Sequence, residues 1–245
     1  MTGETEGSFG ASEETGTTAA YGDLVTAVLF VFIITLVAYV INFSSNQAQA
    51  HSLGQQVSDI TARQSYIVDR ISRRLQTFGV DHDADRKLGV IRISSDDLAF
   101  EPGSYDLAQR QGEKVAAIAR ALSAELPCYG QPEPQVARRL ECGEEQAGQI
   151  RAVAVEGHTD NMPLNVMRNG IRDNTDLSLM RAATVLSHIR LDPTLESLRN
   201  ADGQRLFHAV GYGDGRPIRA HETPVSDRTN RRIEIRLVLD NPWTF

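Results

Sequence analysis

The chain has few basic residues near its amino end. Its 245 residues include 25 Lys and Arg, yet none precedes Arg63, and residues 1–22 carry four glutamates instead. A cleaved signal peptide begins with a basic region, so we expect that this segment is not one and that the apolar run after it stays as an anchor. The same absence leaves the positive-inside rule almost nothing to count beside that run.

Basic tracts, clusters of metal ligands and paired catalytic groups are also missing. A net charge of −7 without a basic tract argues against nucleic-acid binding, which requires a positive face. There is no CxxC and no His/Cys cluster at ligand spacing, so we predict neither a metal site nor a cofactor. The histidines at 158, 188, 208 and 221 are scattered and offer no paired acid and base. An enzyme is therefore the least favoured class.

Cysteine is scarce as well. Cys128 and Cys142 lie fourteen residues apart in a segment rich in Pro and Glu. A disulfide between them would close a short loop, stabilise the fold by about 3 kcal/mol in the chain-entropy model, and persist only in an oxidising compartment. The spacing leaves open whether they pair or are two unrelated thiols.

One long apolar run is present, from Tyr21 to Phe43. The twenty residues from Leu24 onward hold no charged side chain and make about 30 Å of helix, the thickness of a bilayer core. We predict a single transmembrane helix over residues 21–43. The carboxylate of Asp23 lies at its amino end, on the same helical face as Thr26 and Ala27. From the span alone, an interfacial helix cap and an ion-carrying carboxylate both remain open.

Two segments of different character flank the span. Residues 1–20 are mostly Gly, Ser, Thr and Glu, so we expect a disordered tail. Residues 44–87 are predicted to be a linker that contains an amphipathic helix ended by Gly79 and then a loop, DHDADRK. The apolar stripe of that helix either packs on its own domain or forms a seam with a second copy, and it consists of Val57, Ile60, Ile67, Ile71, Leu75 and Phe78.

Residues 88–245 are predicted to form one soluble domain. Apolar patterns indicate strands over 88–93, 150–156, 207–211 and 232–239, and helices over 106–126 and 177–189, the second entered through Asp176 or Ser178. We expect a short strand and turn over 97–105 and an irregular or partly helical insertion over 128–148. This order predicts an α+β fold, a mixed sheet with helices on one face, preceded by the single transmembrane helix.

Charged and amide residues gather at the predicted ends of strands and the start of a helix. Asp160 follows a strand and Arg181 lies one turn into a helix that faces it, a pair able to hold a zwitterion such as an amino-acid head group. Thr159, Asn161 and Asn230 offer neutral hydrogen bonds around such a ligand. The alternative is that Asp160 and Arg181 simply bond each other.

Two neighbouring features are harder to assign. Arg231 and Arg232 are adjacent residues of a predicted strand, so we expect one of them to point away from any shared site. For His158, at a strand end, we expect a hydrogen-bonding role rather than catalysis.

Four ordered motifs, GHTDN, LSxxRA, GYG and NRRIEI, resemble the OmpA-like peptidoglycan-binding domain over roughly residues 88–240. The resemblance implies that Asp160 and Arg181 grip the diaminopimelate of the peptidoglycan stem. On this basis the candidate peptidoglycan-binding residues are Asp160, Arg181, Thr159, Asn161, Asn230 and Arg231.

The span and the domain together resemble the B subunit of flagellar stators, the MotB-like family. The D-x-x-T-A pattern at residues 23–27, the stretch LAFEPGSYDL and the long loop between Asp160 and Arg181 carry this resemblance. It implies ion translocation at Asp23 and Thr26 and a homodimer of the chain. It also implies a ring of A subunits, which are MotA-like in flagellar stators and ZorA-like in the related Zorya system. It further implies a single-pass protein of the bacterial inner membrane with a cytoplasmic amino terminus and a periplasmic domain.

The chain departs from flagellar stator B subunits in two ways. The residues before its span are acidic instead of basic, and the connection between span and domain is shorter. With its cysteine pair and compact length, the chain is more similar to the B subunit (ZorB) of the Zorya anti-phage defence system. A flagellar stator and a plain wall anchor are the alternatives, and the ion, proton or sodium, stays open.

Overall fold

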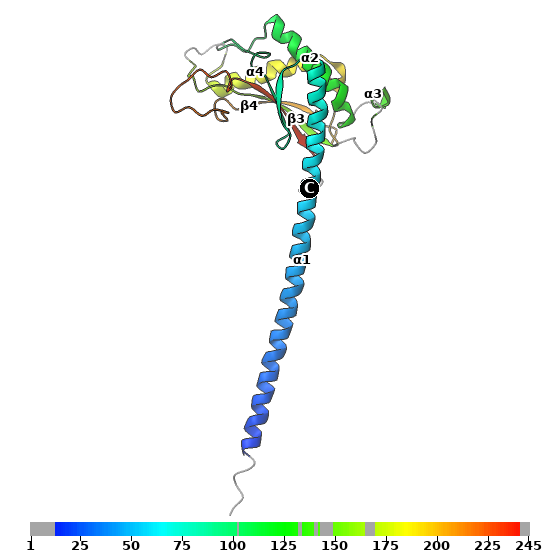
Figure 1. Ribbon diagram of the computed structural model, residues 1–245, viewed down its shortest axis with the longest axis vertical. Helices are drawn as coiled ribbons and strands as arrows, with labels where there is room; N and C mark the ends of the chain where they lie inside the picture. Colours follow the sequence, from blue (N-terminus) through cyan, green and yellow to red (C-terminus); the bar gives the residue numbers. More distant parts are fainter. Residues whose placement is uncertain are drawn as a thin grey trace, which may run out of the picture. The chain divides into compact units, whose positions relative to one another are not determined.

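The computed structural model describes residues 13–101, 103–131, 134–139, 142, 149–164 and 170–240 (Figure 1). The chain divides into two compact units, Met1–Ser58 and Asp59–Phe245. Helix α1 (Glu13–Thr77) begins within the segment that we expected to be a disordered tail, so the last eight residues of that segment are helical. The rest of that prediction, residues 1–12, lies outside the described residues.

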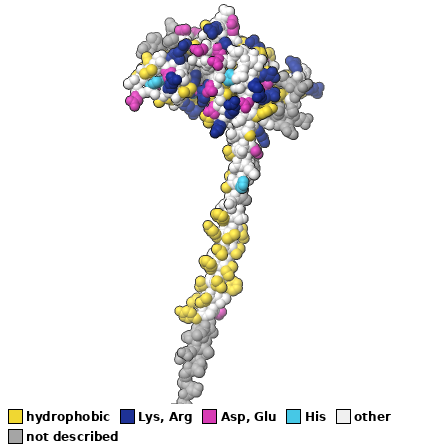
Figure 2. Space-filling model, in the orientation of Figure 1, with side chains coloured by type: hydrophobic (Ala, Val, Ile, Leu, Met, Phe, Trp, Pro, Cys, Tyr) yellow, Lys and Arg dark blue, Asp and Glu magenta, His cyan; other side chains and the backbone are white. Residues whose placement is uncertain are grey.

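The first unit contains the predicted span. By length and composition, α1 is the one helix in the described part of the chain that could cross a membrane. Its apolar side chains are exposed, from Leu24, 61% exposed, to Phe43, 57% exposed, and Figure 2 shows them gathered along the helix. The polar residues after the span, predicted as a linker, continue the same helix.

A five-stranded mixed sheet forms the centre of the second unit. Its strands are β1 (His82–Asp85), β2 (Val90–Ile93), β3 (Ile150–Gly157), β4 (Phe207–Gly211) and β5 (Ile233–Leu239). Their order is β1-β2-β5-β3-β4, and β3 and β4 are parallel while the other pairs are antiparallel.

Two strand predictions need correction. The segment DHDADRK, expected to be a loop, contributes β1, because pairing with β2 sets Asp83 opposite Arg92, with 3.2 Å between the carboxylate and the guanidinium. The described residues of 97–105 form turns instead of a strand. The backbone N–H groups of Asp97 and Leu98 both donate to the carbonyl of Ser94, at 3.1 Å each.

The helices are close to those predicted. They are α2 (Gln109–Glu125), the short η1 (Leu126–Cys128), α3 (Pro134–Arg139), α4 (Asn174–Ile189) and α5 (Pro193–Ser197). The cap of α4 is Asp173, whose carboxylate accepts the N–H of Asp176, so both predicted entry residues were wrong. The first N–H groups of a helix have no carbonyl partner within the helix, and Asp173, just before the helix, accepts one of them.

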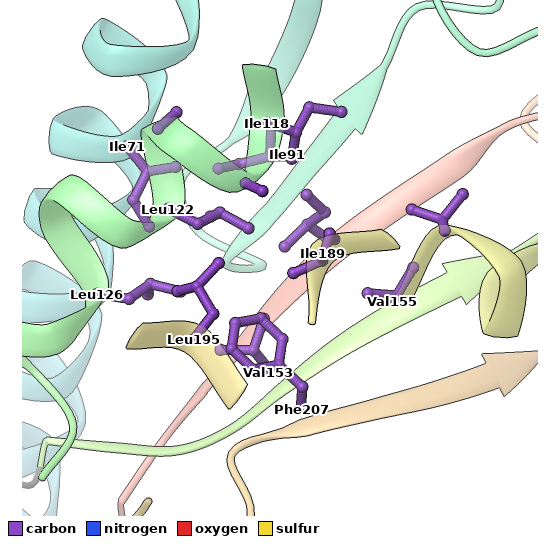
Figure 3. Close-up of a cluster of buried hydrophobic side chains, with 14 of the residues drawn as sticks. Ile71, Ile91, Ile118, Leu122, Leu126, Val153, Val155, Ile189, Leu195 and Phe207 are labelled. Atoms are coloured by element: carbon purple, nitrogen blue, oxygen red, sulfur yellow. The ribbon is translucent and has the colours of Figure 1, made fainter. Parts of the chain in front are cut away.

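The apolar core lies on one face of the sheet. Successive side chains of a strand point to opposite faces, and Val153 and Val155 of β3 lie among the core side chains of the helices (Figure 3). Ile233, Ile235 and Leu237 of β5 belong to the same buried cluster. This confirms the predicted α+β architecture.

The amphipathic stripe of α1 also belongs to this core. Its members Ile67, Ile71 and Leu75 are fully buried within the second unit, while Val57 is 64% exposed. The reading in which the stripe packs on its own domain therefore holds for residues 67–75, and these side chains are not available as a seam.

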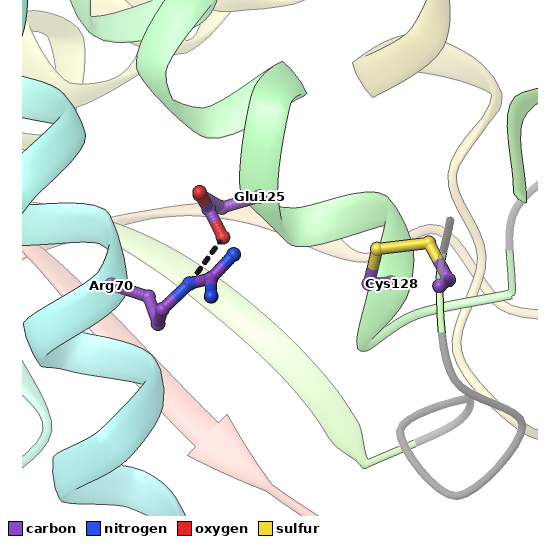
Figure 4. The surroundings of a disulfide bond; sticks show 4 residues. Arg70, Glu125 and Cys128 are labelled. Atoms are coloured by element: carbon purple, nitrogen blue, oxygen red, sulfur yellow. Dashed lines mark hydrogen bonds and ion pairs between the residues drawn. A yellow bond between two sulfur atoms is a disulfide. The ribbon is translucent and has the colours of Figure 1, made fainter. Parts of the chain in front are cut away.

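The end of α2 is tied to α1 and to the insertion. Glu125 accepts a hydrogen bond from Nε of Arg70 at 3.0 Å (Figure 4). It accepts a second from Nε of Arg74 at 2.6 Å. Three residues further on, Cys128 forms a disulfide with Cys142, a pairing that the spacing had left open.

Candidate functional site

The site lies where β3 ends and α4 begins. Two glycines allow α4 to approach the parallel pair β3 and β4 closely. A Cβ atom on Gly157 would lie 2.0 Å from the carbonyl oxygen of Ser178, and one on Gly211 would lie 2.6 Å from the backbone nitrogen of Leu179. Ser178 Oγ in turn accepts the N–H of Gly213 at 2.8 Å. The GHTDN, LSxxRA and GYG motifs thus form one packed unit, which places Arg181 at the end of the sheet.

Asp160 is held from three directions. Its Oδ2 accepts hydrogen bonds from Nη1 of Arg231 and from the backbone N–H of Asp227, the latter at 3.1 Å. The Nδ2 of Asn174, the first residue of α4, donates to the carbonyl of Asp160 at 3.3 Å. The side chain is only 6% exposed, so this carboxylate has a fixed position.

Arg181 is buried without a carboxylate partner in the described structure. Its Nε donates to the carbonyl of Ser104 at 2.9 Å, its Nη2 donates to that of Glu101 at 3.1 Å, and the guanidinium lies over the ring of Phe100. Burial, helped by the nearby charge of Arg231 and opposed by that of Asp160, lowers the pKa of Arg181 to about 10. The alternative in which Asp160 and Arg181 bond each other is therefore not what the structure shows.

A cavity of about 200 Å³, here called the clamp cavity, opens beside Arg181. Four arginines line it, so its potential favours an anionic group. Both Arg231 and Arg232 reach it, contrary to our expectation, because they precede β5 and strand alternation does not apply to them. The full lining is Ser95, Ala99, Phe100, Glu101, His158, Arg181, Arg228, Arg231 and Arg232.

The neutral residues predicted around the ligand have different roles. Asn161 uses its amide on the backbone of residues 221–225, accepting from Val225 N at 2.8 Å and donating to Thr223 O at 2.9 Å. Asn230 similarly binds the backbone of Ile218 and Arg219. Both amides therefore hold loops in place, and their contact with a ligand stays a prediction.

Thr159 and His158 are buried with unsatisfied polar atoms. Thr159 Oγ1 and both ring nitrogens of His158 have no hydrogen-bond partner in the described structure, although each residue is only 2% exposed. Burial and the nearby charge of Arg232 lower the pKa of His158 to about 4, so the imidazole is neutral near pH 7. The ring stacks on Tyr212. Among the described residues, nothing fills the hydrogen-bonding role expected for this histidine.

Behind the clamp cavity, the uncovered face of the sheet carries a sheet-face cluster of ion pairs. Glu156 accepts two bonds from Arg236, at 2.7 and 2.9 Å, and Glu234 accepts bonds from Arg232 at 2.7 Å and Arg92 at 3.0 Å. Burial raises the pKa of Glu234, but the hydrogen bond and charge of Arg232 outweigh burial and lower it overall.

The same cluster contains a possible set of metal ligands. Ligand atoms of Glu156, His158 and Glu234 lie within 4.8 Å of one another. Three guanidiniums already donate hydrogen bonds to the two carboxylates. A divalent cation bound there would be repelled by these three positive charges. The geometry therefore favours ion pairing over metal binding here.

Several lining residues were beyond sequence reasoning. Phe100 and the carbonyls of Glu101 and Ser104 come from a segment that we predicted as a strand and turn, and Arg228, two residues before the NRRIEI motif, had no predicted role. The adjacent pair Arg231 and Arg232 did indicate a positively charged site. We expected only one of them to reach it, because both were assigned to a strand.

Comparison with known proteins gives partial matches. The chain matches no known family model. It is 32% identical over 85 residues to Motility protein B of Bacillus subtilis (strain 168), which covers 35% of this chain and 29% of that protein. It is 35% identical over 83 residues to the uncharacterized protein YtxE of the same strain, covering 34% of this chain and 31% of that protein. The chain thus spans about three tenths of the length of these curated relatives.

Solved structures extend the likeness. A MotB-like protein from Desulfovibrio vulgaris is 18% identical, with 77% of this chain and 99% of that chain covered and a TM-score of 0.50. The periplasmic domain of Helicobacter pylori MotB (residues 78–256) is 19% identical, with 62% and 76% covered and a TM-score of 0.42. The Desulfovibrio structure shows that this chain shares its fold.

Proposed function

We propose that the chain is a membrane-anchored subunit of the MotB-like stator kind, which fastens an ion-driven motor to peptidoglycan. The observation that carries this proposal is the buried Arg181, which has backbone partners but no carboxylate partner among the described residues, beside the fixed carboxylate of Asp160. The match to Motility protein B and the helix that can span a membrane support the proposal.

The clamp suits a zwitterionic amino-acid head group. Arg181 takes the ligand carboxylate, because its planar donors match that group and Asp160 does not neutralise it directly. Both side-chain bonds that Asp160 receives go to Oδ2, and in this proposal Oδ1 accepts the ligand ammonium. Diaminopimelate in the peptide stem of peptidoglycan carries such a head group.

In this proposal Asp23 carries the ion. It stands at the start of an apolar run with no charged side chain, and Thr26 Oγ1, one turn on, donates to the carbonyl of Gly22 at 2.7 Å. A single helix cannot form a pore, so a second copy and a ring of A subunits complete the path. The chain then lies in the bacterial inner membrane with its amino end in the cytoplasm and its domain, with the disulfide, in the oxidising periplasm.

Two sets of substitutions test the two halves separately. Asp23→Asn is expected to abolish motor function while the full-length protein still inserts in membranes and sediments with purified peptidoglycan. Asp160→Ala and Arg181→Ala are expected to abolish sedimentation. If Asp23→Asn leaves function intact while the clamp variants abolish it, the chain is a plain wall anchor.

Within this kind of subunit we propose the Zorya defence type. The acidic segment before the span and the cysteine pair support it, whereas the match to Motility protein B favours a flagellar stator. Deleting the gene is expected to remove protection against phage and leave swimming unchanged. Loss of swimming with protection retained would establish the flagellar alternative, and the genes that flank this one give an independent check.

A further inference from the structure

The clamp cavity continues into a larger groove. This groove, of about 960 Å³, extends over the uncovered face of the sheet past β1, β2 and β5 and the turn at residues 216–218. Four residues line both the clamp cavity and the groove, and they are Ser95, His158, Arg228 and Arg232. A ligand held in the clamp can therefore extend into the groove.

The groove carries an excess of positive charge. Five arginines line it against three acids, Asp81, Asp83 and Glu234. Arg92 forms ion pairs with two of these acids, at 3.2 Å from Asp83 and 3.0 Å from Glu234. Arg232 and Arg236 are also paired, with Glu234 and Glu156. The remaining positive charge favours an anion.

Two of the arginines are not committed to the protein's own acids. Arg216 lies 4.0 Å over the ring of Tyr212 and has no ion pair in the part of the chain that the structure describes. Arg228 is 3.9 Å from Asp96, but the side chains are 67% and 77% exposed, and such a pair contributes little. Arg216 and Arg228 are thus the groove's available cations.

His158 marks the junction of the clamp cavity and the groove. It lines both, it is 98% buried, and neither of its ring nitrogens has a hydrogen-bond partner in the described structure. The nearest carboxylate oxygen, of Glu234, is 3.8 Å from Nε2. A buried polar group without a hydrogen bond destabilises the protein, so a ligand that hydrogen-bonds this ring gains free energy. The neutral ring can meet a peptide N–H or carbonyl with one of its nitrogens.

We propose that the groove is a second subsite for the same ligand, an acidic peptide. Arg216 and Arg228 bind a free carboxylate of the residue next to the one in the clamp, and His158 hydrogen-bonds the peptide between them. The site then distinguishes peptides by the charge of this neighbouring carboxylate. This inference rests on the proposed function of the clamp.

The test uses two synthetic peptides and the full-length protein in detergent. Both contain diaminopimelate preceded by a γ-linked D-glutamyl residue, whose α-carboxyl group is free in one peptide and amidated in the other. Isothermal titration is expected to show about tenfold tighter binding of the free acid, the effect of one charge-assisted contact. In the Arg216→Gln/Arg228→Gln variant the ratio is expected to fall to near one.

Controls separate this inference from the function on which it rests. Both arginines are exposed, so the double variant is expected to unfold at the same temperature as the unmodified protein. Arg110→Gln, an exposed arginine of α2, is expected to keep the tenfold ratio. Equal binding of the two peptides by the unmodified protein overturns the second subsite and leaves the clamp standing. Binding of neither peptide overturns both.

Discussion

Glu234 and Arg181 are both buried charged side chains of the same domain, but they are neutralised in different ways. Glu234 in the sheet-face cluster receives hydrogen bonds from Arg232 and Arg92. Arg181 receives no carboxylate and rests on two backbone carbonyls. A buried charge that is paired can serve the fold, whereas one left without a counter-charge is costly unless a ligand supplies it. The contrast separates a structural cluster from a binding site.

The largest expected effect is on the paired side. Glu234→Gln leaves buried guanidiniums without their carboxylate, and we expect the free energy of unfolding to fall by about 3 kcal/mol. Urea unfolding of the purified protein at pH 7 measures this change. Glu113→Gln, at an exposed position of α2, is the matched control and is expected to change stability by less than about 0.5 kcal/mol. Equal effects of the two substitutions would show that the ion pairs of Glu234 do not stabilise the fold.

A pH effect is expected from His158. Its pKa in the folded protein is about 4, below the ordinary value of 6.5, so the unfolded chain binds the proton first. The stability associated with the neutral ring is full above pH 6.5 and is lost as pH falls from 6.5 to 4. Between about pH 6.5 and pH 4.5 the free energy of unfolding is expected to fall by about 2 kcal/mol from this residue.

The acidic side chains also titrate in this range, so the effect of His158 is measured as the difference between the unmodified protein and a variant without this histidine. Urea unfolding of the unmodified protein and of His158→Gln is compared at pH 7.5 and pH 4.5. The loss of stability on acidification is expected to be smaller in His158→Gln. An equal loss in both proteins would show that His158 does not change protonation on unfolding.

On the unpaired side, Arg181→Lys is expected to weaken binding to peptidoglycan about tenfold, because an ammonium cannot make the planar contacts of a guanidinium. The charge is kept, and stability is expected to fall by no more than about 1 kcal/mol. Sedimentation with insoluble peptidoglycan and urea unfolding give the two values. A loss of stability as large as that of Glu234→Gln would show that Arg181 serves the fold instead of ligand binding.

The smallest expected effect is at Asn161, which supports the site from a distance. Asn161→Ala removes the bonds to Thr223 and Val225, and we expect a loss of about 1 kcal/mol in stability. Peptidoglycan affinity is expected to fall only a few-fold, as loop order decreases. A loss of affinity as large as that of Arg181→Lys would show direct ligand contact, as the sequence first suggested.

The sequence predicted the architecture well because its apolar pattern is clear. Ile233, Ile235 and Leu237 alternate with charged or exposed residues, and a membrane span needs only length and apolarity. β1 was missed because its pattern is polar, and its stability depends on pairing with β2 through Asp83 and Arg92.

The candidate site was only partly predictable. Motif spacing located Asp160 and Arg181, but which donor reaches which acceptor depends on loops that carry no periodic signal. Those loops bring Arg231 to Asp160, and they bring the carbonyls of Glu101 and Ser104 to Arg181. In the described part of the chain they also leave the ring nitrogens of His158 without a hydrogen-bond partner, a result that no spacing indicates.

The most direct test of the clamp is its preference for a zwitterion. Isothermal titration of the full-length protein in detergent would compare diaminopimelate with pimelate, which has the same carboxylates but no ammonium groups. We predict that diaminopimelate binds at least about tenfold more tightly. We also predict that Asp160→Asn removes this preference, because Asp160 supplies the charge for the ammonium. Equal binding of the two compounds, or binding of neither, would contradict the assignment of Asp160 and Arg181 as a zwitterion clamp.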